Sequence, residues 1–226
     1  MDGFRILFLT ATLLVPCAWS ADASLDDVFK RIDKSAATFK ALTADMKRTS
    51  HTELVNANDV EEGTFALKRF KPGDIRILMD ITKPEPKKFA LGGGKGQAYY
   101  PKANEVQVMD VKRHRDLVNE LLLLGFGSTS NELKTAYDIT LGGPETVNGT
   151  PAIRLDLVSK NPEIRRTIKR VELWVAESGL PVQQKLYESG GDYQIVTYSN
   201  MAVNRNLPDS AVQLVLPKGV KVTPIK

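Results

Sequence analysis

Apolar residues recur at helical spacing in one segment close to the N-terminus. From Leu25 to Leu42 they fall on one side of a helix, with Asp, Lys and Arg between them. Ser24 is suited to cap the first turn, and Asp26 and Asp27 favour the positive end of the helix dipole. The pattern therefore predicts an amphipathic helix that begins after Ser24 and ends near residues 41–43.

Beyond this helix, and as far as Val111, apolar residues occupy every second position. Such alternation is typical of strands with one apolar face and one solvated face. Within residues 64–70 and 74–82, one face carries Phe65, Leu67, Ile75, Ile77, Met79 and Ile81. Residues rich in Gly, Pro and Asn separate these strands at 71–74, 84–86, 92–96 and 101–104.

A second series of alternating segments follows Gly127. It predicts strands over residues 153–157, 171–175, 182–187, 193–203 and 212–216. Glycine pairs and an Asn-Gly dipeptide, a strong hairpin signal, separate them.

Residues 116–125 interrupt the strand pattern with a short, leucine-rich helix. Leu117, Leu121 and Leu124 lie in it, and Gly125 and Gly127 end it. The four consecutive leucines at 121–124 cannot all face one side of a helix. Some of them must contact a second apolar surface: more core, a partner, or an internal cavity.

These elements predict an α+β fold that is mainly β. A long sheet with one apolar face needs a cover, and only two helices are available. We expect an unclosed antiparallel β-barrel, or half-barrel, with an N-terminal helix and a short helical lid over the concave face. The spacing alone does not distinguish this curled sheet from a flat one.

The first residues have the layout of a secretory signal peptide. A polar start with Arg5 precedes an apolar run over residues 6–15, and small residues at 18 and 20 suit a cut after Ser20. We expect residues 1–20 to be the signal peptide and residues 21–226 to form a single exported domain in the periplasm. The alternative is a lipid anchor at Cys17, although Pro16 suits a lipoprotein processing box poorly.

Composition removes several classes of chemistry. Cys17 is the only cysteine, and the histidines are His51 and His114, so thiol catalysis and metal sites lack ligands. Glu61 and Glu62 are neighbours on a strand and face opposite sides, which makes a poor acid–base pair. The basic excess is spread along the chain, unlike that of nucleic-acid binders. We expect no catalytic residues, no metal, no cofactor and no nucleic acid, and therefore a protein that is not an enzyme.

Arg69 has the same strand parity as Phe65 and Leu67. An unpaired charge on an apolar face is unfavourable. Arg69 should therefore hydrogen-bond to backbone carbonyls at the rim of an opening, or else lie at a strand end where its side chain reaches water.

Five short segments, in order along the chain, resemble periplasmic outer-membrane lipoprotein carriers. This LolA-like family is related to the LolB receptor and to lipid sensors that regulate sigma factors. The segments are residues 39–46 (FKALTADM), 62–69 (EGTFALKR), 94–101 (GKGQAYYP), 174–181 (WVAESGLP) and 216–220 (LPKGV).

The resemblance implies a half-barrel whose cavity takes acyl chains of lipoproteins or other lipids. It also implies an inner-membrane lipoprotein-release transporter as donor and an outer-membrane receptor as acceptor. The family's lid is held shut by a strand arginine that aligns with Arg69. The glycines at 92–94 and the apolar segment 121–127 depart from the family pattern and leave the cargo and the handover route open.

Our hypothesis is a monomeric carrier whose lid fills the cavity when no cargo is bound and is displaced by cargo. Two other functions stay open: a lipid-sensing regulatory module that binds a partner protein, and a hydrolase of envelope lipids. The predicted cavity residues are Phe65, Leu67, Ile75, Ile77, Met79, Leu117, Leu121, Leu124 and Phe126, with Arg69 as the latch of the lid.

Overall fold

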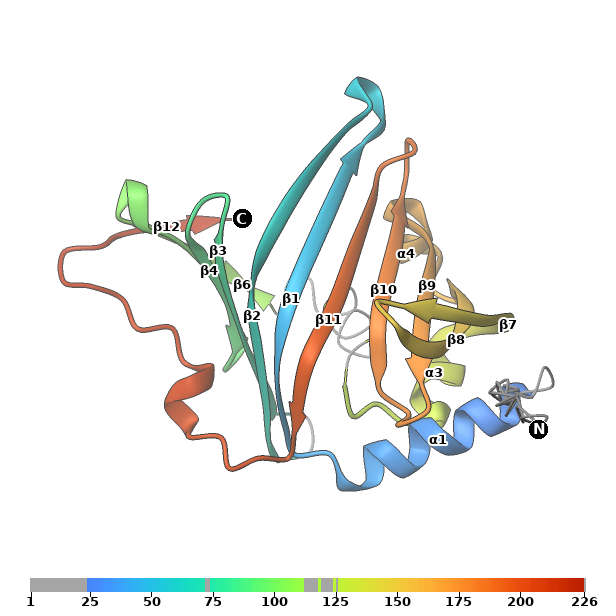
Figure 1. Ribbon diagram of the computed structural model, residues 1–226. Coiled ribbons are helices and arrows are strands. Elements are labelled where there is room, and N and C mark those ends of the chain that lie inside the picture. The colour runs from blue at the N-terminus through green and yellow to red at the C-terminus, as the bar shows by residue number, and fades with distance from the viewer. Residues whose placement is uncertain (1–23, 72–73, 112–117, 119–123, 125, 226) are drawn as a thin grey trace, which may run out of the picture.

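The computed structural model describes residues 24–71, 74–111, 118, 124 and 126–225 (Figure 1). Its helices are α1 (Leu25–Thr38), α3 (Ser130–Ala136) and α4 (Pro162–Thr167), with single 3₁₀ turns η1 (Glu53–Val55), η2 (Pro101–Ala103) and η4 (Asp209–Val212). Its strands are β1 (Ala41–Thr52), β2 (Ala57–Lys71), β3 (Asp74–Lys83), β4 (Lys87–Gly92), β5 (Lys95–Tyr100), β6 (Glu105–Asp110), β7 (Tyr137–Val147), β8 (Thr150–Ser159), β9 (Ile168–Ala176), β10 (Pro181–Glu188), β11 (Tyr193–Val203) and β12 (Lys221–Ile225).

All these strands join one unclosed, 12-stranded sheet. Its order is β12-β6-β5-β4-β3-β2-β1-β11-β10-β9-β8-β7, so β12 and β7 form its two edges. The neighbours are antiparallel except β12, which pairs in parallel with β6. The predicted half-barrel with an N-terminal helix is therefore confirmed, with one parallel strand added. The predicted lid helix at 116–125 lies outside the described residues apart from Val118 and Leu124.

The N-terminal helix is capped as its sequence indicates. The Ser24 hydroxyl accepts a hydrogen bond from the Asp27 backbone N–H at 3.2 Å. The helix ends at Thr38, three residues before the predicted end, because its next backbone groups find partners elsewhere. The Asn204 side chain accepts from the N–H of Lys40 at 2.7 Å and donates to the carbonyl of Thr38 at 2.8 Å. The chain turns there from α1 into β1.

The three helices pack on one face of the sheet, which we call the inner face. Leu155 and Leu173, which are paired across β8 and β9, are buried there against Phe29 of α1, Leu133 of α3 and Ile164 of α4. Burying a side chain of this size contributes roughly 2 kcal/mol. The inner face of β7–β10 is therefore a closed core.

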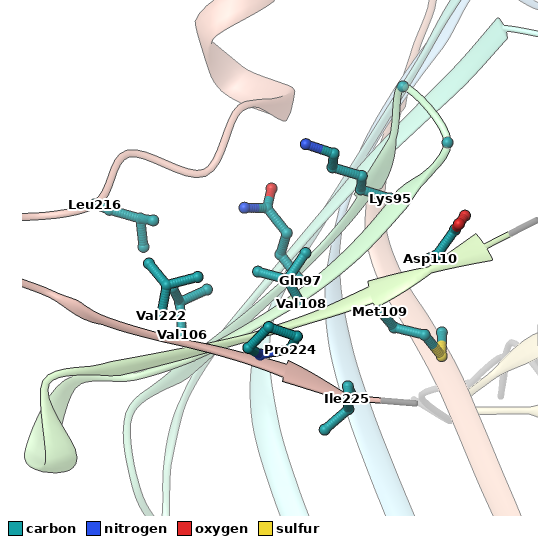
Figure 2. A pocket seen from close by; sticks show the side chains of 12 residues that line it. Lys95, Gln97, Val106, Val108, Met109, Asp110, Leu216, Val222, Pro224 and Ile225 are labelled. Carbon is teal, nitrogen blue, oxygen red and sulfur yellow. The ribbon is translucent and has the colours of Figure 1, made fainter.

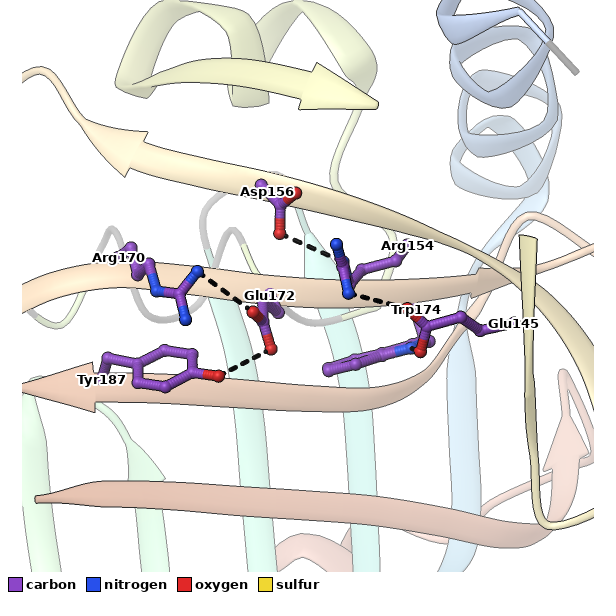
Figure 3. A network of polar contacts seen from close by, with 7 residues as sticks. All are labelled: Glu145, Arg154, Asp156, Arg170, Glu172, Trp174 and Tyr187. Carbon is purple, nitrogen blue, oxygen red and sulfur yellow. Dashed lines mark hydrogen bonds and ion pairs between the residues drawn. The ribbon is translucent and has the colours of Figure 1, made fainter. Parts of the chain in front are cut away.

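The opposite, outer face of the same strands carries polar side chains that bind one another (Figure 3). Trp174 donates through Nε1 to Glu145 at 2.7 Å, and Arg154 donates to the other oxygen of Glu145 at 2.7 Å. Glu172 is buried, and it accepts from the Tyr187 hydroxyl at 3.0 Å. The network satisfies a buried carboxylate without a covering layer.

The strand predicted over residues 212–216 is wrong. Residues 209–212 form η4, and no strand follows until β12. Residues 204–220 run along the outer face, where the Lys68 ammonium donates to the carbonyl of Leu207 and pairs with Asp209 at 2.7 Å. Val212 is buried and Val215 is exposed to solvent. The alternation in the sequence therefore reflects burial against the outer face and not pairing with another strand.

Within the described residues, none of the helices combines the length and the apolar character that crossing a membrane requires.

Candidate functional site

The inner face of β1–β4 is an apolar surface, which we call the inner wall. Strand register places its members on one face: Ala44 pairs with Phe65, Phe65 with Met79, and Met79 with Phe89. The complete wall is Leu42, Ala44, Met46, Phe65, Leu67, Ile75, Ile77, Met79, Ile81 and Phe89.

All five of the predicted cavity residues on β2 and β3 belong to this wall. Phe65 and Leu67 are buried, whereas Ile75, Ile77 and Met79 are only partly buried. Ile75, Ile77 and Met79 therefore keep apolar surface that the described residues do not cover, whereas Ile81 on the same strand is fully buried.

Phe126 anchors the segment that follows the leucine run to the inner wall. Its ring centroid lies 5.8 Å from that of Phe65, 5.1 Å from that of Tyr198 and 6.2 Å from that of Phe39. Phe65 and Tyr198 are themselves 5.3 Å apart in an edge-to-face arrangement. Aromatic pairs at such distances contribute about 1 kcal/mol beyond their burial.

Phe39, Phe65, Phe126 and Tyr198 form an aromatic cluster, and the Tyr198 hydroxyl is the polar side-chain group within it. Its hydroxyl accepts a hydrogen bond from Nε2 of Gln184 at 2.8 Å. Burial raises the pKa of Tyr198 above its ordinary value, because the ionised form would lose its hydration. The group therefore stays neutral at physiological pH, and the cluster carries no charge.

Arg69 reaches the same segment from the end of β2. Its guanidinium donates to the carbonyl of Gly127 and lies 5.8 Å from the ring centroid of Phe39. Gly127 has a φ of +83°, and a Cβ there would lie 2.6 Å from both the Arg69 guanidinium and the Phe39 ring. Only glycine fits this contact without displacement.

The structure does not place the predicted leucines at 117, 121 and 124 on the inner wall. Leu124 is buried in the core under α1, α3 and α4, rather than against Phe65 as the hypothesis had it. Leu117 and Leu121 lie outside the described residues.

Charged side chains end the inner wall at the far end of β1 and β2. Arg48 and Glu61 are directly paired across these strands, and Lys87 follows on β4. Arg48 donates through Nε to Glu61 at 2.7 Å, and Lys87 binds the other carboxylate oxygen. We call these three residues the ionic triad. The sequence alone indicates that Arg48 lies on the same face of its strand as Met46. The contact between Arg48, Glu61 and Lys87 depends on strand pairing and could not be predicted from the sequence.

Glu62 faces away from the triad and pairs with Lys83 at 3.1 Å. The two neighbouring glutamates thus have separate partners, as strand parity predicted. Burial opposes ionisation of Glu61, but hydrogen bonds from Lys87 and Arg48 outweigh it and hold its pKa below the ordinary range. Glu61 is therefore ionised at neutral pH.

A hollow of about 800 Å³ opens on the outer face, at the edge formed by β5, β6 and β12 (Figure 2). Leu216 lies across it from Val106 and Val222. The strand register places Gln97 and Val108 on the outer face of the sheet, whereas Ile77 lies on the inner face. This hollow is therefore separate from the inner wall. In the described part of the chain, no three His, Cys, Asp or Glu side chains gather as a metal site.

A protein-family model described as "Outer membrane lipoprotein carrier protein LolA" matches residues 37–214. A search of curated proteins finds no match. The fold is similar to the crystal structure of MucB, with a TM-score of 0.53 and 14% identity over 84% of this chain and 62% of the MucB chain.

It is also similar to an uncharacterized conserved protein from Thermus thermophilus, with a TM-score of 0.52 and 13% identity over 88% of this chain and 98% of the other. A LolA superfamily protein from Nitrosomonas europaea, NE2245, aligns with a TM-score of 0.41 and 13% identity over 85% and 99%. This chain spans less than two thirds of MucB, and the likeness to MucB and to the Thermus protein concerns the fold alone.

Proposed function

Because the chain belongs to the LolA family of outer membrane lipoprotein carrier proteins, we propose that it carries lipoproteins across the periplasm with their acyl chains on the inner wall. The supporting observation is the half-covered apolar surface of Ile75, Ile77 and Met79, beside the buried Phe65 and Leu67. Partly exposed apolar surface next to an apolar core is suited to binding an apolar partner.

The energy of acyl burial is sufficient for carriage. Each buried methylene contributes about 0.8 kcal/mol, so one long acyl chain supplies on the order of 10 kcal/mol before losses. Such binding keeps a lipid out of water but also makes release slow. A carrier therefore needs an empty state that competes with the cargo.

The segment anchored by Phe126 and Gly127 supplies that competition in our proposal. It contacts the inner wall through Phe126 and is bound to β2 by Arg69. Leu117 and Leu121 lie shortly before these anchors in the sequence. The segment closes over the wall when cargo leaves, and the Arg69–Gly127 hydrogen bond acts as the latch of the closed state.

In this proposal the protein catalyses no reaction of its cargo and uses no cofactor. Its donor and acceptor are an inner-membrane transporter and an outer-membrane receptor. The alternative is a sensor that binds lipid in the same place and passes the signal to a protein partner. Mass spectrometry of purified protein separates the two: a mixture of lipoproteins supports the carrier, while one stoichiometric protein partner that carries no acyl chain supports the sensor and contradicts the carrier.

The latch is tested with Arg69→Leu. A hydrogen bond to a charged donor contributes roughly 1.5–3 kcal/mol, so losing it weakens the closed state. We expect cargo to load but to pass to acceptor membranes about tenfold more slowly. The measurement is transfer of a fluorescent triacylated peptide.

Arg205→Leu is the matched control, because Arg205 is an exposed arginine near the same end of the sheet. Transfer by Arg69→Leu at the wild-type rate, with equal folding by circular dichroism, would reject the latch. Failure of wild-type protein to bind any acylated peptide would reject the carrier.

A further inference from the structure

The ionic triad lies on the inner face of the sheet and not on its outer face. Arg48 follows Met46 on the same face of β1, and its partner Glu61 follows Gly63 on the same face of β2. Lys87 occupies the next position beyond Phe89 on the same face of β4. Charge therefore begins where the inner wall ends.

The triad is poorly hydrated and carries an excess of positive charge. The side chains of Arg48, Glu61 and Lys87 are exposed by 20%, 12% and 25%. Both cations share one carboxylate within the triad, and Glu85, which pairs with Lys102, is a further carboxylate that interacts with Lys87 electrostatically. The Arg48 guanidinium lies 5.4 Å and the Lys87 ammonium 5.8 Å from the ring centroid of Phe89, a member of the wall. Cation–π contacts at these distances are favourable and hold both cations at the border of the inner wall.

Space for a polar group lies next to the triad. Glu61 and Lys87 line a hollow of about 550 Å³ that Tyr100 and Gln107 also line. The other glutamates on its lining are occupied, since Glu85 pairs with Lys102 and Glu105 with Lys221. Asp59 is the remaining carboxylate of the lining and is exposed, so an anion would bind at the Lys87 end.

We propose that the ionic triad recognises the anionic head group of an amphiphile whose acyl chain lies on the inner wall. The inference rests on the proposed function, because it needs the wall to hold an acyl chain. A carboxylate or phosphate in this hollow accepts a hydrogen bond from Lys87 in place of part of the interaction of Lys87 with Glu61, while Arg48 stays paired with Glu61. The protein would then select acidic lipids from uncharged ones of equal chain length.

The test uses palmitate, palmityl phosphate and monopalmitoylglycerol, which present a carboxylate, a phosphate and an uncharged head group on the same chain. Dissociation constants are measured by titration calorimetry with the full chain. We expect wild-type protein to bind the two anions about tenfold more tightly than the uncharged lipid. The difference between carboxylate and phosphate identifies the head group, and added salt should reduce the preference.

Two variants move the preference in opposite directions. Lys87→Met leaves a neutral Arg48–Glu61 pair and should bring the ratio of anionic to uncharged affinity close to one. Glu61→Gln leaves two uncompensated cations and should enlarge the ratio. Lys88→Met is the matched control, because Lys88 faces the outer side and pairs with Asp80 at 2.5 Å. It should keep the wild-type ratio.

The outcomes separate the inference from the function. Equal binding of all three lipids by wild type, or an unchanged ratio in Lys87→Met, overturns the head-group site and leaves the carrier standing. A loss of preference in Lys88→Met as large as in Lys87→Met overturns it too. If no lipid binds at all, the proposed function itself fails. If Lys87→Met does not fold, the enlarged ratio in Glu61→Gln decides.

Discussion

Gly127 joins the segment after the leucine run to two different structures at once. Its carbonyl accepts from Arg69 of β2, and its Cα lies against the ring of Phe39 at the end of α1. A single residue thus connects the first helix, the second strand and the segment after the leucine run. Any side chain at this position would separate those three parts.

Gly127→Ala is expected to lower the free energy of unfolding by about 3 kcal/mol, because it combines a left-handed φ with a Cβ clash. Gly149→Ala is the control: its φ of +78° is similar, but nothing lies within 4 Å of an added Cβ. It should lower the free energy by only about 1 kcal/mol. Urea unfolding followed by circular dichroism measures both, and equal losses would contradict the close contact.

Strand parity was sufficient to place Phe65, Leu67 and Ile77 on one face from the sequence. The same rule applied to Arg48 and Glu61 would have put charge on that face as well. It could not have brought Lys87 to them, because that contact depends on the register between β2, β3 and β4. Nor could it assign Leu124 to the helix-covered core, since the choice between two apolar surfaces is tertiary.

At the scale of elements, alternation predicts which side chains are buried but not which strand is paired. The segment 193–203 was predicted with the bounds of β11, where both neighbours form ladders. Residues 212–216 show similar alternation but lie across the outer face without a pairing partner. The last pairing is instead made by β12, and no pattern in its residues indicated a position next to β6.

β12 covers the edge of β6 with residues that discourage further pairing. It carries Lys221 and Pro224, and both are features of protected edge strands. Deleting residues 221–226 should expose the β6 edge and the buried Val106, and thereby increase self-association in sedimentation experiments. Lys221→Gln removes only the ion pair with Glu105 and should stay monodisperse. A monodisperse deletion variant would show that the edge needs no cover.

At the scale of the whole molecule, several carboxylates link stability to pH. The pKa of Glu61 is lowered because hydrogen bonds from Lys87 and Arg48 outweigh burial, and that of Glu85 is lowered by its hydrogen bond with Lys102. A lowered pKa in the folded state means that the unfolded chain binds more protons as the pH falls. The stabilisation is therefore present above the ordinary glutamate pKa of about 4.3 and is lost below it.

Comparing wild type with Glu61→Gln from pH 7 to pH 3 tests this linkage. The variant should be less stable than wild type at neutral pH, because two cations lose their shared partner. The difference should shrink as the pH falls through the folded-state pKa of Glu61 and the wild-type carboxylate takes up its proton. A difference that stays constant down to pH 3 would mean that the pKa of Glu61 is not lowered by folding.

The open sheet has a mechanical consequence. In a closed barrel, strand number and shear fix the radius, so a wider bore requires broken ladders. Here the two edges, β7 and β12, are not joined to each other. The curvature of the unclosed sheet can therefore change through strand twist while every hydrogen bond between its strands stays intact. In the proposed carrier, one set of wall residues would then accommodate cargo with one acyl chain or with several.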